Sequence, residues 1–466
     1  MKNRKQVIVI ALILVLGALA PMLDTTMTNI AINKMINALN TTVNVMQWVT
    51  TIDILAIGIF VPITGWLIDQ VNGKWLYLTG ILIFGIGSFV SATSSSVGLL
   101  IIGRLIQGIA TGIIVPVLSI LLVRASKGIA LGSLMSIIGL PVVLAPILGP
   151  TFGGLILHYL NWRWIFFANI PIVILSLTVV CFFLPNFKPL GIKSKFDLVG
   201  FLLLSGMFIF LIIGITNFSN LPKESVISQI IINLFVGIDL LIAYLYHANN
   251  LGKTAIVPLS LFKLKNYSAS TILLFMSGIT VNGAMFLLPL YLQNVRGLST
   301  IMTGIYLIPQ GVGLLLARSQ IGKLTDRFGA KWPTVISIII SVISTLPFAV
   351  VTKQTSPMLI CSLLLIRGAA EGGLTIPVMA DSYQGIGEEF VASATTGVRI
   401  VQNVGGAFGT ALLATIIQIQ LNGNFPTISI LTPIYQVAFI GTVIGTILAL
   451  IPALFLSNYR SGGKDK

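Results

Sequence analysis

Long apolar segments separated by short polar loops run through the whole chain. About 20 apolar residues are needed to cross the hydrocarbon core of a bilayer, and fourteen segments approach or exceed that length. No loop between them exceeds about twenty residues, so the chain has no room for a soluble catalytic domain. The pattern predicts an all-α polytopic membrane protein with fourteen transmembrane helices. These spans are predicted at residues 6–31, 45–68, 75–93, 97–120, 131–157, 162–184, 197–216, 228–247, 267–292, 301–321, 332–352, 357–380, 391–418 and 432–457.

Two of the polar loops repeat each other. Residues Gly65–Lys74 read GWLIDQVNGK and residues Gly322–Lys331 read GKLTDRFGAK, so glycine, leucine, aspartate and lysine recur about 257 residues apart. Such a match indicates internal duplication. The loops follow spans 2 and 10. A duplication of six spans accounts for twelve of the fourteen, so spans 7 and 8 lie between the two repeats and belong to neither. We expect an N-terminal six-helix bundle at 1–185, an inserted two-helix linker at 186–265 and a C-terminal six-helix bundle at 266–466.

Composition agrees with a membrane protein and excludes several other classes. Of the 466 residues, 56% are hydrophobic and 8% are charged, far from the usual soluble composition. The formal charge is +15, yet the 27 Lys and Arg residues are scattered among short loops, so we expect no nucleic-acid binding. Cys181 and Cys361 lie in predicted spans, and neither they nor the two histidines have metal-ligand spacing. We expect no disulfide, no metal and no cofactor.

The loop charges predict the orientation of the chain. Most Lys and Arg residues of the loops fall on one side of the predicted membrane, and the positive-inside rule then places both termini in the cytoplasm. The first apolar segment, about 25 residues long, is longer than a signal-peptide core and lacks a small-residue cleavage site, so we expect it to remain as the first span. Richness in Ile, Asn and Lys suggests a bacterial cell membrane (inner or plasma membrane).

Two signatures resemble the major facilitator superfamily. Gly65–Lys74 resembles the loop between its helices 2 and 3, and Asn161–Phe167, followed by Asn169 and Pro171, resembles its entry to helix 6. The resemblance covers essentially the whole chain. It implies the major facilitator fold, here as two six-helix bundles plus an inserted helix pair.

Three further motifs, in helices 1, 4 and 5, resemble the fourteen-span drug:proton antiporter branch of that family. They are Leu23–Thr26 with Asn29 and Ala31, Arg104 with Gln107 and Gly108, and Ala145–Pro150 with Gly153 and Gly154. The resemblance implies a multidrug efflux transporter that exports amphipathic, often cationic compounds in exchange for protons by alternating access. Asp53 stands where the family usually has an aromatic residue, and Gln70 where it often has arginine, which leaves the substrate preference open.

Charged residues inside predicted spans need a partner, a cavity or a function, since each costs about 2.5 to 3.5 kcal/mol at the bilayer centre. At about 1.5 Å per residue, Asp24, Asp53 and Arg104 lie at one depth, roughly 10 to 12 Å below the outer ends of their helices. We expect Asp24 to couple transport to protons, with Arg104 as a fixed counter-charge. The alternatives are a purely structural pair of these two residues and, for Arg104, helix packing or snorkelling.

A second acid, Glu371, lies in the middle of predicted span 12. A carboxylate in a low-dielectric cavity attracts a lipophilic cation without fixed geometry, so we expect Glu371 to recognise substrate. Glu371 could instead form a buried pair with Arg367 or Arg399. The other members of the predicted substrate site are Asp53, Asn29 and Gln107, although Asp53 could equally be a hydrogen-bonding residue at the outer end of its helix. Asp239 is expected to be a packed or lipid-edge polar residue, and Asp381 to anchor an interface.

Two groups of residues are predicted to control conformation. The aspartates of the repeated loops, Asp69 and Asp326, end spans 2 and 10, where each can cap or pair with a neighbouring helix and hold a cytoplasmic gate. The glycines of span 5 permit tight contact with a helix of the other half, which would seal the protein against ion leakage. The alternatives are ordinary small-residue packing and a purely topological role for the lysines. The full set is Gly65, Asp69, Gly73, Lys74, Asp326, Arg327, Gly149, Pro150, Gly153 and Gly154.

Other functions compete with drug export. An exporter or flippase of an endogenous lipid or metabolite, or an importer, would use the same scaffold. A membrane-embedded enzyme would need a nucleophile, a metal cluster or a phosphate-binding loop, and the sequence has no P-loop and no His or Cys cluster. A channel or scaffold would not explain a duplicated, gated fold. We therefore expect a monomer that contacts small-molecule substrates, protons and the lipid bilayer.

Overall fold

The computed structural model describes residues 4–41, 43–126, 131–138, 149, 152–189, 196–216, 224–421 and 428–458, and this part of the chain is almost entirely helical. The α-helices of the first part are α1 (Arg4–Ala38), α2 (Val43–Gln70), α3 (Gly73–Ala92), α4 (Val97–Ser126), α5 (Leu131–Ile138), α7 (Trp164–Phe167), α8 (Asn169–Phe183), α9 (Leu198–Thr216) and α10 (Glu224–Leu251). They are followed by α11 (Lys265–Ser277), α12 (Gly283–Asn294), α13 (Thr300–Phe328), α14 (Lys331–Thr345), α15 (Pro357–Asp381), α16 (Val391–Leu421), α17 (Ile428–Leu448) and α18 (Leu450–Ala453).

Short helices complete the described chain. The 3₁₀ segments are η2 (Gly252–Thr254), η3 (Leu259–Lys263), η5 (Leu346–Val350) and η6 (Glu388–Phe390), and η4 (Gly278–Asn282) is a π-helix. The π-helix joins α11 to α12, so the three form one continuous membrane-length segment. π-helical turns inside longer helices are rare and local.

Twelve helices of the described chain are long and apolar enough to cross a membrane. The two further predicted spans are 131–157, which includes residues outside the described part, and 301–321, which lies within the 29-residue helix α13. The protein is thus an all-helical multi-pass membrane protein, and the count of fourteen spans stays a prediction. Among the twelve, α10 has the smallest buried share of its apolar window, 17%.

Local sequence explains where the repeated loops interrupt the helices. After α2 ends at Gln70, the side chain of Asn72 accepts a hydrogen bond from the backbone N–H of Lys74 at 3.0 Å and caps α3. In the second loop, Gly329 has a φ of 81° and ends α13. Only glycine adopts that conformation without steric cost.

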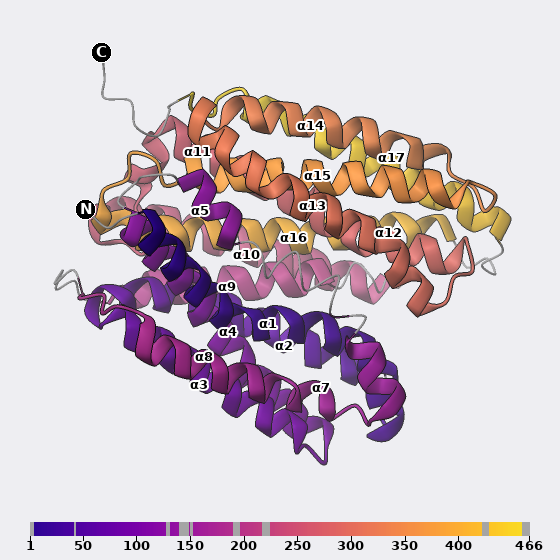
Figure 1. Cartoon of the computed structure of the whole chain (residues 1–466), viewed down its shortest axis with the longest axis horizontal. Coiled ribbons are helices and arrows are strands. Elements are labelled where there is room, and N and C mark those ends of the chain that lie inside the picture. Colours follow the sequence, from indigo (N-terminus) through magenta and orange to yellow (C-terminus); the bar gives the residue numbers. More distant parts are fainter. Residues whose placement is uncertain are drawn as a thin grey trace. The chain divides into compact units, whose positions relative to one another are not determined.

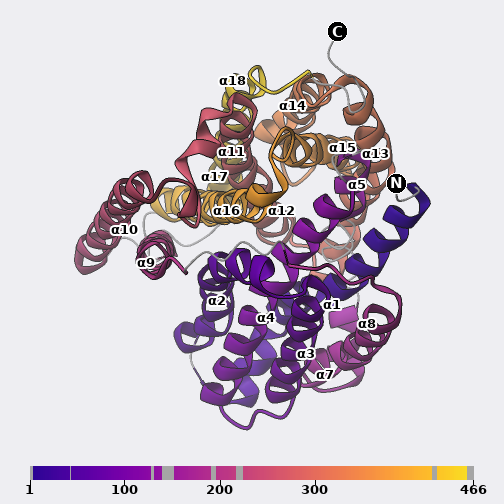
Figure 2. The same ribbon diagram turned by 90° about the vertical axis from the view of Figure 1, so that its left-hand side faces the viewer.

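The chain divides into two compact units. The first comprises Met1–Lys127, Ile137–Phe201 and Ile386–Thr396. In this unit α4 packs against α2 and α3, and α3 also contacts α8 (Figure 2). Small residues allow the close approach, because a Cβ at Gly108 of α4 would lie 2.6 Å from the carbonyl oxygen of Asp53 in α2. The sequence therefore brings the acid of α2 directly against α4.

The second unit comprises Gly128–Ser136, Leu202–Gly385 and Gly397–Lys466. Its helix α15 lies between α13 and α14, and the three run side by side (Figure 1). A Cβ at Gly368 of α15 would overlap the carbonyl oxygen of Gln310 in α13, and one at Gly313 would overlap that of Leu365. The contact between α13 and α15 is thus a backbone-to-backbone contact that any larger residue would disrupt. The predicted bundle boundaries at 1–185, 186–265 and 266–466 stay a prediction.

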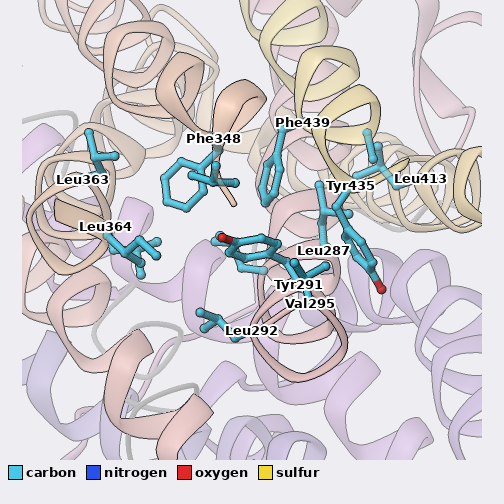
Figure 3. Close-up of a cluster of buried hydrophobic side chains, with 14 of the residues drawn as sticks. Leu287, Tyr291, Leu292, Val295, Phe348, Leu363, Leu364, Leu413, Tyr435 and Phe439 are labelled. Carbon is cyan, nitrogen blue, oxygen red and sulfur yellow. The ribbon is translucent and has the colours of Figure 1, made fainter. Parts of the chain in front are cut away.

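Aromatic side chains fill one core of the second unit. Tyr291 of α12 lies in edge contact with Phe439 and Tyr435 of α17, and Phe348 of η5 packs on Phe439 with ring centroids 5.1 Å apart (Figure 3). All four rings are buried. Burial of large side chains at this density fixes α12, α17 and η5 as one rigid group.

Candidate functional site

A buried arginine joins three helices of the first unit. Arg104 on α4 is 1% exposed and donates from Nη2 to the carboxylate of Asp53 on α2 at 2.7 Å. Its Nη1 donates to the carboxylate of Asp24 on α1, and its Nε donates to the carbonyl oxygen of Val49 at 3.2 Å. The common depth expected for these charged residues is confirmed by the two ion pairs.

Neutral polar side chains complete the surroundings of Asp24. Gln107 donates from Nε2 to Asp24 Oδ1 at 3.2 Å and to the hydroxyl of Ser88 at 2.9 Å. Asn169 at the start of α8 donates from Nδ2 to the same carboxylate oxygen at 2.6 Å. Each of these side chains is at most 1% exposed. We name Asp24, Asp53, Ser88, Arg104, Gln107 and Asn169 the Asp24 cluster.

The charges of the Asp24 cluster do not cancel. One guanidinium faces two carboxylates, so the ionised cluster carries one net negative charge on buried side chains. Burial disfavours such an excess charge, and binding of one proton removes it. The cluster is therefore the candidate proton site of the described residues.

The sequence anticipated only part of this cluster. The sequence predicts functional roles for Asp24, Asp53, Arg104 and Gln107. Gln107 is predicted to contact the substrate, and in the structure its side chain donates to Asp24. Asn169 belongs to the helix 6 signature, which signalled its presence but not its partner. Ser88 carries no signal beyond being a polar residue in an apolar helix. The side chain of Asn29 lies outside the described residues.

A second buried charged group lies in the second unit, between α13 and α15. Glu371 accepts a hydrogen bond from Gln310 Nε2 at 2.8 Å and from Arg367 Nε at 3.2 Å, both at its Oε1 atom. Arg367 and Glu371 are each 3% exposed. Of the two partners considered for Glu371, the structure gives Arg367, one helical turn earlier on the same face. We name these three residues the Glu371 cluster.

The first repeated loop is bound to neighbouring helices of its own unit. The carboxylate of Asp69 pairs with Arg124 at the end of α4, and Lys74 donates from Nζ to the carbonyl oxygen of Cys181 at 2.7 Å. A Cβ at Gly73 would lie 3.3 Å from the side chain of Phe187. A Cβ at Gly65 would lie 3.5 Å from the carbonyl oxygen of Ala392, in the first turn of α16.

The second repeated loop holds α5 at its N-terminus. Asp326 accepts hydrogen bonds from the backbone N–H groups of Gly132 at 2.8 Å and Ser133 at 3.1 Å, and from the hydroxyl of Ser133. A carboxylate at this place satisfies free N–H groups and complements the helix dipole. The expected capping of a neighbouring helix by Asp326 is confirmed. Arg327, next to it, is exposed and lies over the ring of Phe328.

Arg318, which the sequence did not single out, binds the same short helix. It lies on α13 and is 6% exposed. Its guanidinium donates to the carbonyl oxygens of Met135 at 3.3 Å and of Ser136. Asp326 and Arg318 of α13 thus bind successive turns of the described part of α5.

One glycine of the helix 5 motif has a close neighbour in its own unit. A Cβ at Gly149 would overlap the hydroxyl of Thr26 on α1, in the same unit, and the expected contact with a helix of the other half stays a prediction. A small residue predicts close approach but not the identity of the approaching helix. Gly153 is buried, a Cβ at Gly154 would meet nothing within 4 Å, and Pro150 lies outside the described residues.

The two remaining acids have different surroundings. Asp239 is exposed on α10. Asp381, at the end of α15, is buried and accepts hydrogen bonds from the backbone N–H of Ser457 at 3.2 Å and from Ser270 at 3.4 Å. Within the described residues, no group of three His, Cys, Asp or Glu side chains could hold a metal ion.

The chain belongs to the major facilitator superfamily, whose family model matches residues 14–410. The protein is thus a membrane transporter and not an enzyme. It is 29% identical over 412 residues to a multidrug resistance protein B homolog of Mycobacterium tuberculosis, covering 88% of this chain and 76% of that protein. It is 27% identical over 467 residues to the lincomycin resistance protein LmrB of Bacillus subtilis, covering 98% and 97% of the two chains.

Solved structures show the same fold. The human organic anion transporter MFSD10 has a TM-score of 0.64 at 17% identity, covering 97% of this chain and 100% of that chain. The proton:xylose symporter XylE has a TM-score of 0.65 at 14% identity, covering 96% of each chain. At these identities the likeness concerns the fold alone.

Proposed function

We propose that this transporter is a proton-coupled antiporter of the fourteen-span drug:proton branch, which exports amphipathic, often cationic compounds by alternating access. The observation that carries the proposal is the Asp24 cluster, in which one buried arginine faces two buried carboxylates. The relatives named for multidrug and lincomycin resistance support export of toxic compounds. The protein would act as a monomer in the cell membrane of a bacterium, with both termini in the cytoplasm and two six-helix bundles flanking an inserted helix pair.

Asp24 is the proposed proton carrier. It accepts hydrogen bonds from Arg104, Gln107 and Asn169, which hold the carboxylate in place. A proton from the acidic outside would neutralise Asp24 and favour release of a cationic substrate. Return to the inward-facing state would release the proton and restore the net negative charge that favours a new cation. Arg104 would keep the second carboxylate, Asp53, paired during this cycle.

The substrate and gate roles follow the same proposal. Glu371, in the middle of α15, is the proposed substrate-facing acid of the second bundle, with Asp53, Asn29 and Gln107 lining the first. Asp69 and Asp326 are the proposed gate residues, because each ends a long helix and binds another helix of its unit. Breaking such contacts would change the relative stability of the two access states.

Transport into vesicles with an acidic lumen tests the proposal. The membrane potential is clamped to zero, and accumulation of tetraphenylphosphonium is compared with and without a protonophore. Accumulation that requires the pH gradient and acidifies the outside in step with uptake is expected. Uptake that follows only the substrate gradient, from protein that is shown to be folded, would refute proton coupling. Lipids and metabolites in the same assay distinguish a flippase or metabolite exporter.

A further inference from the structure

The two buried arginines of α4 and α15 differ in how many of their donors are used. Arg104 donates from Nε, Nη1 and Nη2 to four acceptors. Arg367 donates from Nε to Glu371, but its buried Nη1 atom has no hydrogen-bond partner among the described residues. The guanidinium of Arg367 therefore keeps an unused donor in the middle of a membrane-spanning helix.

The neighbouring helices also present different side chains to the two charged groups. Gln310 on α13 and Asp53 on α2 are separated by the same interval, about 257 residues, as the repeated loops. Asp53 accepts a hydrogen bond from its arginine, whereas Gln310 donates to Glu371. A carboxylate only accepts, so this bond fixes the Gln310 amide with its nitrogen toward Glu371. At this position the second repeat turns a donor toward its acid, and the described residues offer Arg367 Nη1 no acceptor.

A buried guanidinium donor without an acceptor is costly, and proteins almost always pair such groups. Gly368 and Gln310 are in backbone contact, so α13 and α15 are closely packed at this point and Gln310 stays beside Glu371. We propose that Arg367 Nη1 binds an oxygen of the transported compound, so that the preferred substrates carry a carbonyl or carboxylate oxygen on an apolar body. This inference rests on the proposed export function and names the chemical group of the substrate that the Glu371 cluster would bind.

A carbonyl oxygen and a carboxylate oxygen of the substrate would change the net charge of this site differently. Arg367 and Glu371 form a neutral pair. A carbonyl oxygen adds no charge to that pair, whereas a carboxylate adds one negative charge that protonation of Glu371 would balance. A lipophilic cation without an acceptor oxygen gains nothing from Arg367 in either case.

Equilibrium binding to purified protein in lipid nanodiscs, without a proton gradient, tests the inference separately from proton coupling. The probes are a rhodamine carboxylic acid, its methyl ester and tetraphenylphosphonium, which has no oxygen. Arg367→Lys keeps the positive charge beside Glu371 but replaces the three nitrogen atoms of the guanidinium by a single ammonium nitrogen. It is expected to weaken binding of one or both oxygen-bearing probes about tenfold, and binding of tetraphenylphosphonium less than about twofold.

Controls separate recognition from folding. Arg163→Lys makes the same change at a guanidinium that already donates to the carbonyl oxygen of Ser94, and it should leave all three affinities unchanged. Arg367→Gln combined with Glu371→Gln replaces the ion pair by neutral amides and is used only to show by thermal melting that the fold does not need the pair, while probe selectivity is judged on Arg367→Lys, which keeps Glu371. Loss for the acid alone identifies a carboxylate, and loss for both identifies a carbonyl. Equal changes for all three probes, or no change, would overturn the inference.

Discussion

Asp326 and Ser133 are joined twice, because the carboxylate of Asp326 accepts hydrogen bonds from both the backbone N–H and the hydroxyl of Ser133. This is the N-terminal capping pattern of a helix, except that the capping aspartate comes from a residue nearly two hundred positions away in the chain. The position of α5 therefore depends on where α13 ends.

Removal of the Asp326 carboxylate should release α5. Asp326→Ala is expected to cost about 1 to 2 kcal/mol of the contact, as for the loss of a helix cap, and to lower turnover more than substrate affinity. Asp326→Asn keeps one acceptor oxygen and should lie between Ala and the natural residue. Accessibility of a cysteine placed on α5 reports the release. Identical accessibility in all three proteins would show that Asp326 does not hold α5.

The pair of Asp69 and Arg124 should act as one unit in the gate. Asp69→Asn and Arg124→Gln each remove the ion pair, so each should favour the inward-facing state and lower turnover. The double variant should be no worse than either single variant, because neighbouring partners are not additive. The turnover of the natural protein, the two single variants and the double variant is measured in vesicles containing equal amounts of folded protein. Additive losses would mean that the two residues act separately.

Stability of the second unit should depend on its glycine contact. Gly368→Ala places a methyl group where the carbonyl oxygen of Gln310 lies, and overpacking of this kind costs roughly 1 to 3 kcal/mol. Gly98→Ala, also in a long helix, is the matched control because a Cβ there meets nothing within 4 Å. The melting temperature in detergent should fall for the first variant and stay or rise slightly for the second. Equal melting temperatures would contradict the close approach of α13 and α15.

The sequence predicted the elements of the Asp24 cluster better than its contacts. Helical rise alone placed Asp24, Asp53 and Arg104 at one depth, and the charges then had few possible partners. Asn169 could not be assigned to Asp24, since a helix motif does not tell which face meets which neighbour. Ser88 could not be distinguished from the other small polar residues of α3.

Long-range pairing was the least predictable part. The glycines of the helix 5 motif indicated close packing, but Thr26 as the neighbour of Gly149 follows only from the three-dimensional arrangement. The binding of Arg318 to backbone carbonyl oxygens of α5 had no signal, because backbone carbonyls leave no mark in a sequence. The loop repeat, in contrast, predicted correctly that Asp326 would cap a neighbouring helix.

The central claim is that Asp24 carries the coupled proton, and proton release per substrate transported by Asp24→Asn measures it directly. The amide keeps the shape and can still accept a hydrogen bond from Arg104, but it does not titrate. We expect vesicles with this variant to bind substrate and exchange it downhill, with no accumulation driven by a pH gradient and no proton release. Gradient-driven accumulation at the rate of the natural protein, with the same proton release, would show that Asp24 is structural and that another acid carries the proton.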